Sequence, residues 1–145
     1  MEIVSEEKFE IARKKINELK GNVVFSSYDD ELNRKILEKE KISVLLISQK
    51  NRKDFQKQRN SGFNSVLAKL AKKNNVKIGI NLDEIIDSQK NSKPQIIARI
   101  KQNIRICNKN KLNMCFISQK YKRDVYGLKS LGLVLGMPTW MLKEF

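Results

Sequence analysis

Two short basic segments of this chain each follow the same tetrapeptide. Ile47-Ser48-Gln49-Lys50 recurs as Ile117-Ser118-Gln119-Lys120. The RNA-binding candidates are Lys50, Arg52, Lys53 and Arg59 in the first segment, which also contains Lys57, and Lys120, Lys122 and Arg123 in the second. Lysine and arginine beside serine and glutamine suit the binding of phosphates and ribose hydroxyls. We therefore predict that the two segments bind RNA.

A second, smaller group of cations lies on a predicted helix that begins near Pro94. Lys101 and Arg105 are four residues apart, on the polar side of that helix. They are further RNA-binding candidates. Tyr121 has the ring needed to stack on an unpaired base, but aromatic residues are only 7% of the chain. Stacking is therefore not expected to be the main mode of binding.

The same inventory argues against catalysis by this chain. The sequence contains no histidine, which excludes histidine general bases and histidine-rich metal centres. Asp29, Asp30 and Asp83 are the only acids close to predicted strand ends, and each is suited to cap a helix. We expect no catalytic residue, no metal site and no bound cofactor. A small phosphoesterase that uses acids and lysines alone stays open as an alternative.

Length and charge indicate one domain with an anionic partner. The chain has 145 residues, with 30 Lys and Arg against 16 Asp and Glu, so its net charge is +14. Residues 1–40 carry 8 basic and 10 acidic residues, whereas residues 41–145 carry 22 and 6. A charge this large opposes compaction unless an anion offsets it. We assign residues 1–145 to a single domain whose anion-binding surface lies after residue 40.

Alternating apolar segments predict the elements that position these residues. The expected helices cover residues 3–19, 29–37, 60–73, 94–107 and 128–135, and the expected strands cover residues 23–25, 42–47, 76–82 and 112–117. A helix followed by about four βα units predicts an α/β fold with a parallel sheet. An open doubly wound sheet and part of a barrel both fit, and the chain is short for the roughly 200 residues of a full barrel. Cys107 and Cys115 lie in apolar patterns and are expected to pack in the core as free thiols.

Two stretches resemble a known family. Residues 61–80, SGFNSVLAKLAKKNNVKIGI, are similar to its segment SGLN-x-VLAKLA-x-x-N-x-VAIxI. Residues 98–107, ARIKQNIRIC, followed by Ser118 and by LGLVLGM at 131–137, are similar to its R-x-RQNIRLCRKY, SS and LxxLGxxLGM segments. The family is protein component 3, the thirty-kilodalton subunit, of archaeal and eukaryotic ribonuclease P.

The resemblance implies a TIM-barrel-like fold, akin to the PHP phosphoesterases but lacking their metal site. It implies a non-catalytic subunit that pairs with protein component 2 and other protein subunits and binds the ribonuclease P RNA. That RNA removes the 5′ leader from precursor tRNA with Mg²⁺, so this chain would contact precursor tRNA only indirectly. The resemblance also marks Asn64 as a weaker candidate for a partner or RNA contact.

The chain departs from the family pattern at several places. It lacks N-terminal βα elements, which implies a shortened or incomplete barrel. Gln119 stands where the family has glycine, and Gly127-Leu128 stands where it has Asp-Leu. The segment 120–126 is also shorter than in the family, so contacts made there are expected to differ.

Location and a competing function complete the expectations. No apolar run approaches the roughly 20 residues that span a bilayer, and the acidic N-terminus is unlike a signal or transit peptide. We therefore expect a cytoplasmic, archaeal-type protein without a membrane partner. A stand-alone RNA-binding protein is the remaining alternative. Lack of affinity for component 2 would favour it.

Overall fold

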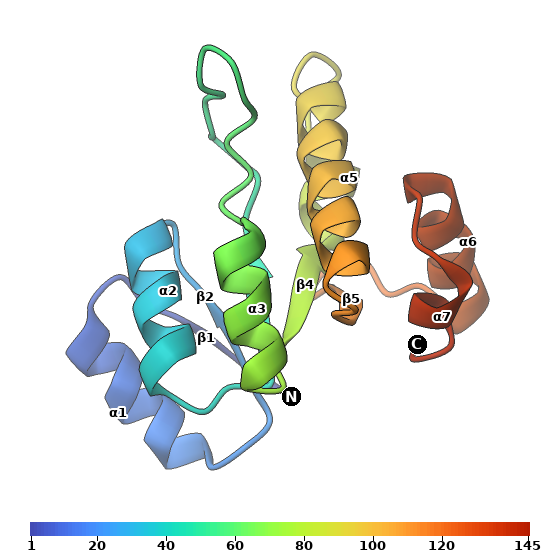
Figure 1. The fold of residues 1–145 in the computed structure, drawn as a ribbon. Coiled ribbons are helices and arrows are strands. Elements are labelled where there is room, and N and C mark those ends of the chain that lie inside the picture. Colours follow the sequence, from blue (N-terminus) through green and yellow to red (C-terminus); the bar gives the residue numbers. More distant parts are fainter.

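The computed structural model describes residues 1–145 and contains five strands and seven helices. The strands are β1 (Glu2–Ser5), β2 (Val23–Ser26), β3 (Val44–Ile47), β4 (Lys77–Asn81) and β5 (Met114–Ile117). The helices are α1 (Phe9–Leu19), α2 (Asp30–Lys39), α3 (Ser65–Lys73), α4 (Leu82–Asp87), α5 (Lys93–Lys109), α6 (Val125–Leu135) and α7 (Thr139–Leu142). Strands and helices alternate along most of the chain (Figure 1).

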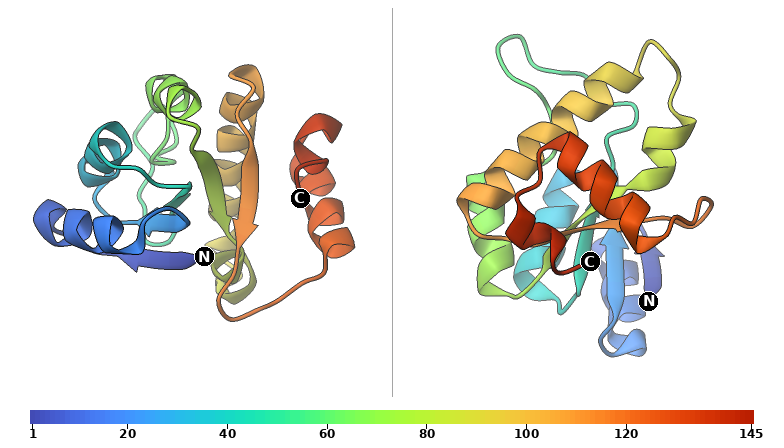
Figure 2. Two further views of the ribbon diagram at one scale, coloured as in Figure 1. Left: turned by 90° about the horizontal axis from the view of Figure 1, so that it is seen from below. Right: turned by 90° about the vertical axis from the view of Figure 1, so that its right-hand side faces the viewer.

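The sheet has the strand order β1-β2-β3-β4-β5, and every neighbouring pair is parallel. In a doubly wound sheet the strand order reverses at a switch point, whereas in a (β/α) barrel consecutive strands are neighbours. Seen from below, helices α1, α2, α3 and α5 form an arc around one side of the sheet (Figure 2). The fold is therefore part of a TIM-barrel-like sheet, as the family resemblance implied; the sequence pattern alone had also allowed a doubly wound sheet.

Most of the core lies between the sheet and these helices. Alternate strand residues face the helices, among them Phe25, Leu45 and Ile78, which are almost fully buried. The near-continuous apolar strands follow from burial of both faces of a parallel sheet. Ala68 and Ala71 on α3 and Ile100 and Ile104 on α5 belong to the same cluster. This layer fixes the strand ends on which the candidate site is built.

The other face of the sheet carries a small second cluster. Val24, Val44 and Leu46 are buried there, and Ile117 packs against them. Gly79 occupies the middle of this face. A Cβ at Gly79 would lie 2.9 Å from Val44 Cγ1 and 3.3 Å from Ile117 Cγ1. The missing side chain thus lets residues from β3 and β5 approach across β4.

The structure corrects three expectations about the elements. Ile3 lies in a strand and not in the first helix, because residues 2–5 pair with β2. Helix α3 begins at Ser65 and not near residue 60, because Asn64 is its N-cap and its side chain accepts from the Leu67 N–H. Helices α4 and α7 were not expected. The predicted helices from Asp29 and from the neighbourhood of Pro94 are confirmed.

The two cysteines are free and pack in apolar surroundings. Cys107 is fully buried and Cys115 is half-buried. Burial raises the pKa of Cys107 well above its ordinary value and that of Cys115 to about 11. Both thiols are therefore protonated at neutral pH. No helix combines the length and the apolar character that crossing a membrane requires.

Candidate nucleic-acid interface

The parallel sheet brings the two repeated tetrapeptides to the same edge. Strand β3 ends at Ile47 and strand β5 ends at Ile117, and β4 lies between them. Parallel strands present their carboxyl ends on one side of a sheet, which is where α/β folds place functional residues. The basic segments that follow these strands therefore leave the sheet on the same side.

Two consecutive acids after β4 hold these segments in place. Glu84 accepts hydrogen bonds from the Ser48 hydroxyl and, at 2.8 Å, from the Gln49 N–H. Asp83 accepts from the Ser118 hydroxyl at 2.6 Å and from the Gln119 N–H at 2.9 Å. The repeated Ser-Gln pair thus makes the same contact twice, on opposite sides of β4.

The same contact occurs a third time, between the first two strands. Glu7, after β1, accepts from the Ser27 hydroxyl at 2.8 Å and from the Tyr28 N–H at 3.1 Å. In each contact, a carboxylate that follows one strand accepts two hydrogen bonds from the loop after the neighbouring strand. One comes from a serine hydroxyl and the other from the N–H of the residue after that serine. These acids satisfy loop donors that would otherwise be unpaired.

Asp83 accepts further hydrogen bonds from the loop after β5. Burial disfavours its charged form, but hydrogen bonds from the Ser118 hydroxyl and from the N–H groups of Gln119, Lys120 and Tyr121 outweigh burial. The pKa of Asp83 is therefore lowered. Its carboxylate is a structural acceptor of loop N–H groups, not the N-cap that the sequence suggested. The N-cap of α4 is Asn81, whose side chain accepts from the Glu84 N–H.

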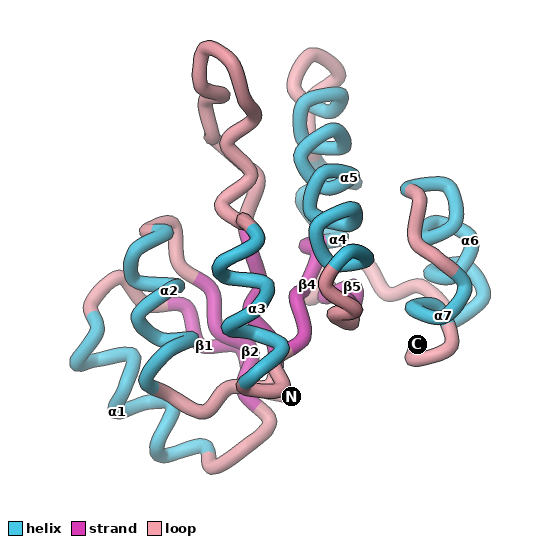
Figure 3. The backbone as a smooth tube through the Cα atoms, viewed as in Figure 1, coloured by secondary structure: helices cyan, strands magenta, loops and turns pink.

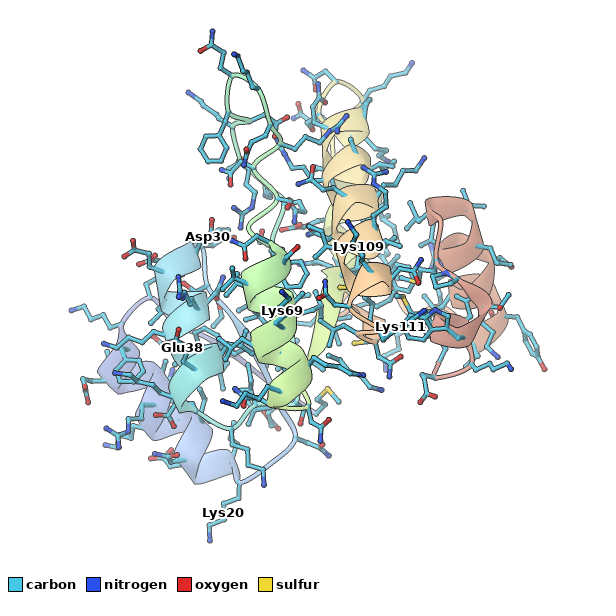
Figure 4. All side chains as sticks on the ribbon, in the orientation of Figure 1. Lys20, Asp30, Glu38, Lys69, Lys109 and Lys111 are labelled. Atoms are coloured by element: carbon cyan, nitrogen blue, oxygen red, sulfur yellow. The ribbon has the colours of Figure 1, made fainter.

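The other two acids also have local partners. Asp29 caps α2 by accepting from the N–H groups of Glu31 and Leu32, as predicted. Asp30 forms a two-pronged ion pair with Arg52, at 2.8 and 2.9 Å. Asp30 lies at the start of α2, where Figure 4 labels it.

The long connection between β3 and α3, residues 48–64, projects beyond the helices; we call it the arm. Figure 3 shows it as a pink loop that rises at the same end as the start of α5. Arg99 of α5, only 5% exposed, holds the base of the arm. Its guanidinium donates to the carbonyls of Gln49 and Arg52 and to the Asp54 carboxylate. The arm is thus anchored to the main body of the fold.

Asn103, one turn further along α5, adds a second anchor. Its side-chain amide donates to the Ser61 carbonyl, which also accepts from the Gln49 amide at 2.8 Å. Sequence reasoning named Lys101 and Arg105 on this helix but not Arg99 or Asn103. Their spacing was a usable signal, because both polar residues lie on the apolar stripe that buries Ile96, Ile100 and Ile104.

Arg52 differs from the other predicted cations. Its side chain is only 9% exposed, and it donates to Asp30 and to the Ser48 carbonyl. Gly62 makes room for it, since a Cβ there would collide with the guanidinium. Unlike the other cations of its segment, Arg52 is therefore not a free surface charge. This arginine joins the arm to α2.

Most of the other predicted cations are exposed and have no acidic partner within 4.0 Å. They are Lys50, Lys53, Arg59, Lys101, Arg105, Lys122 and Arg123. Lys120 is also exposed but pairs with Asp87 at 3.1 Å, which raises the pKa of Lys120. The sheet places the cations that follow β3 and β5 at its carboxyl edge, with Lys101 and Arg105 farther along α5.

Tyr121 and Asn64 have structural partners. The Tyr121 hydroxyl donates to Asp87 at 2.6 Å, and the Lys120 ammonium lies 5.0 Å from the centre of its ring. The hydrogen bond from Tyr121, followed by that from Lys120, lowers the pKa of Asp87. Asn64 is exposed, but its side-chain oxygen is used to cap α3. Local structure thus accounts for both residues.

A polar cavity of about 760 Å³ lies between the base of the arm, α4 and the start of α5. Asp83, Glu84 and Asp87 line it, together with Lys50 and Arg99. No group of three or more His, Cys, Asp or Glu side chains is arranged to hold a metal ion. The loop contacts of Asp83 and Glu84 give these acids a structural role.

Cations also gather at the opposite end of the sheet. Lys69 and Lys73 lie on α3, and Lys109 and Lys111 lie at the end of α5, all of them exposed. Figure 4 labels three of these four residues. Cations in the last turn of a helix are favoured by the helix dipole. This group serves below as a charge-matched control.

Curated proteins that are similar to this chain in sequence share one name. The chain is 27% identical over 116 residues, 80% of its length, to ribonuclease P protein component 3 of Methanococcus vannielii. It is 26% identical over 108 residues to the protein of that name from Methanococcus maripaludis. The chain is therefore similar to ribonuclease P protein component 3. It spans about half the length of these curated relatives, 47% and 43% respectively. No family model matches it.

A solved structure supports the fold of this chain. One chain in a cryo-EM structure of archaeal ribonuclease P with mature tRNA matches it with a TM-score of 0.78. The match covers 96% of this chain and 61% of the other chain, at 19% sequence identity. At that identity the likeness concerns the fold, which is the partial barrel described above.

Proposed function

We propose that this protein is a non-catalytic subunit of ribonuclease P that binds the RNA subunit and supports removal of the 5′ leader from precursor tRNA. The observation that carries the proposal is the similarity to component 3 over 80% of the chain. The charge distribution supports it, because residues 41–145 hold 22 of the 30 cations. In this proposal Mg²⁺ acts at the RNA subunit.

The proposed RNA-binding surface is the set of unpaired cations near the carboxyl edge of the sheet. Lys53 and Arg59 extend from the arm, and Lys122 and Arg123 follow β5. Each phosphate that such a cation neutralises releases counterions, with a salt slope of about −0.7 to −0.9 per contact. Lys101 and Arg105 on α5 enlarge the surface. Arg52 supports this surface by joining the arm to α2 through its ion pair with Asp30.

The test is reconstitution of the protein with the RNA subunit and precursor tRNA from the same organism. The variant Lys53→Ala/Arg59→Ala/Lys122→Ala/Arg123→Ala is expected to bind the RNA more weakly, with a salt slope flatter by about one unit per lost contact. The matched control is Lys69→Ala/Lys73→Ala/Lys109→Ala/Lys111→Ala, which removes the same charge at the other end. Equal losses for both variants would contradict a localised surface. No stimulation of leader removal by the parent protein would contradict the function.

A protein partner is the second part of the proposal. Helix α6 exposes Val125, Tyr126, Leu133 and Val134, and exposed apolar side chains grouped on one helix mark an interaction surface. We assign this surface to protein component 2. A partner that binds only the folded state raises apparent stability. The melting temperature should rise with component 2, and an unchanged value at saturating partner would refute this assignment.

The absence of catalysis by the protein itself is tested separately. Purified protein without RNA is expected to leave precursor tRNA and simple phosphodiesters intact, with or without divalent metal. Metal-dependent cleavage that disappears in Asp83→Asn would favour the phosphoesterase alternative. RNA binding without any affinity for component 2 would favour a stand-alone RNA-binding protein.

A further inference from the structure

The tip of the arm is a small closed loop. The Asp54 carboxylate accepts from the Asn60 N–H at 3.0 Å and from Arg99 Nε at 2.9 Å. These bonds join the two ends of the segment Phe55–Arg59 and anchor it to α5. The hydrogen bond from Arg99, with that from Asn60, lowers the pKa of Asp54, so this carboxylate stays charged at neutral pH. The tip therefore extends from a base whose position is fixed by these hydrogen bonds.

All five tip residues are exposed. They are Phe55, Gln56, Lys57, Gln58 and Arg59. The Phe55 side chain is 59% exposed and belongs to neither apolar cluster of the fold. The tip thus contains one free ring, two side-chain amides and two cations, without an acid. Asp54, the acid beside it, is directed to Arg99 and the Asn60 N–H.

This combination matches what an unpaired nucleotide requires. A base stacks on an aromatic ring, its edges bond to side-chain amides, and its phosphates pair with lysine and arginine. The ring of Tyr121, by contrast, is held by Asp87 and Lys120. Tyr126 is exposed, but it lies on α6 with Leu133 and Val134, a setting that suits a protein partner. Tyr28 is exposed in the loop after β2, beside Lys50 and Lys53 at the base of the arm. Phe55 is the aromatic residue of the arm tip, in one five-residue segment with Lys57 and Arg59.

We propose that the arm tip binds unpaired RNA, with a nucleobase stacked on Phe55 and adjacent phosphates on Lys57 and Arg59. This inference deepens the proposed function, because it names the kind of RNA segment that the arm recognises. A double helix cannot use the ring, since its bases are already stacked on one another. The tip therefore distinguishes single-stranded from double-stranded RNA.

Binding to a single-stranded RNA oligonucleotide, and to a duplex of the same length, tests this proposal. Phe55→Ala is expected to weaken single-strand binding by about 5- to 100-fold and to leave duplex binding unchanged. The salt slope should stay constant, because no charge is lost. Lys57→Ala should instead flatten the single-strand slope by about 0.7. Val66→Ala, which removes an exposed apolar side chain from α3, is the control and should change neither affinity.

Two further variants separate stacking from other contacts. Phe55→Trp should retain affinity, and its fluorescence should be quenched by the oligonucleotide against the constant emission of Trp140 in the parent. Phe55→Leu keeps an apolar side chain but no ring, and should bind as weakly as Phe55→Ala. Full affinity of Phe55→Leu, or loss of component 2 binding in place of RNA binding, would overturn the proposal.

The outcome also distinguishes this proposal from the proposed function. If Phe55→Ala binds single-stranded RNA normally while the parent still supports leader removal, only the stacking inference fails. If the parent does not bind the ribonuclease P RNA, the proposed function fails. Matching urea midpoints for the Phe55 variants would confirm that a change in binding reflects the tip and not the fold.

Discussion

Asp83 and Glu84 are neighbours in the chain, yet their carboxylates hold the loops that follow two different strands. Glu84 binds the Ser48–Gln49 segment after β3, and Asp83 binds the Ser118–Gln119 segment after β5. The start of α4 is thus a two-sided clamp between the basic segments. Its integrity determines how these segments are placed relative to each other.

Removal of either carboxylate should destabilise the protein. Glu84→Ala and Asp83→Ala leave partly buried hydroxyl and N–H donors without acceptors, at a cost of about 1–3 kcal/mol each. Urea denaturation measures this cost. Glu38→Ala is the control, because its exposed pair with Arg34 contributes only about 0.3–0.5 kcal/mol. Losses no larger than that of Glu38→Ala would contradict the clamp.

The clamp also predicts how stability depends on pH. Asp83 has a lowered pKa in the folded state, so it contributes stability above its unfolded pKa of about 3.9. That contribution is lost as the pH falls through the lower, folded pKa. The urea midpoint of the parent should therefore fall on acidification below about pH 4. Asp83→Asn should fall less steeply over the same range, and parallel curves would exclude this role.

Gly79 predicts a packing limit on the face of the sheet that carries Val24, Val44 and Leu46. A Cβ would lie 2.9 Å from Val44 Cγ1 and 3.1 Å from Leu46 Cδ1, closer than normal contacts allow. Gly79→Ala should therefore destabilise the fold by about 1–3 kcal/mol through overpacking. The larger Gly79→Val should cost more. A thermal melt measures both, and an unchanged midpoint for Gly79→Ala would show that this face has spare room.

The anchor of the arm can be tested by proteolysis. Arg99→Lys keeps the charge, but a lysine ammonium lacks the planar guanidinium that donates to Asp54 and to two carbonyls at once. The arm should then open locally, and trypsin should cleave faster after Lys53, Lys57 or Arg59. Lys101→Arg on the same helix is the control. Cleavage of Arg99→Lys at the parent rate would show that the arm is held by other contacts.

Most of the fold could be predicted because its pattern is local. Buried strands such as Val44–Ile47 read as continuous apolar runs, and the helices that follow them show a 3.6-residue period. Strand β1 was missed because only two of its four residues are apolar and Ile3 also fits the stripe of a helix. Residues 2–5 form a strand because they pair with β2, and this pairing joins residues that are distant in the sequence.

The site was predictable where topology alone places residues. The two basic segments share an edge because parallel strands share a direction. The role of Arg52 was not predictable, since its partner Asp30 is 22 residues away in the chain. Arg99 reaches Asp54 over 45 residues. A sequence pattern identifies a charge, but it does not reveal whether a distant opposite charge neutralises that residue.

The consecutive order of the strands has a consequence for synthesis. Each of β2 to β5 pairs with the strand made just before it, so no strand waits for a later segment in order to find its neighbour. The sheet can grow one strand at a time during synthesis, because the N-terminal segments leave the ribosome first. The arm, however, gains its anchor only when Arg99 emerges with α5. Until then its cations extend from an incomplete sheet.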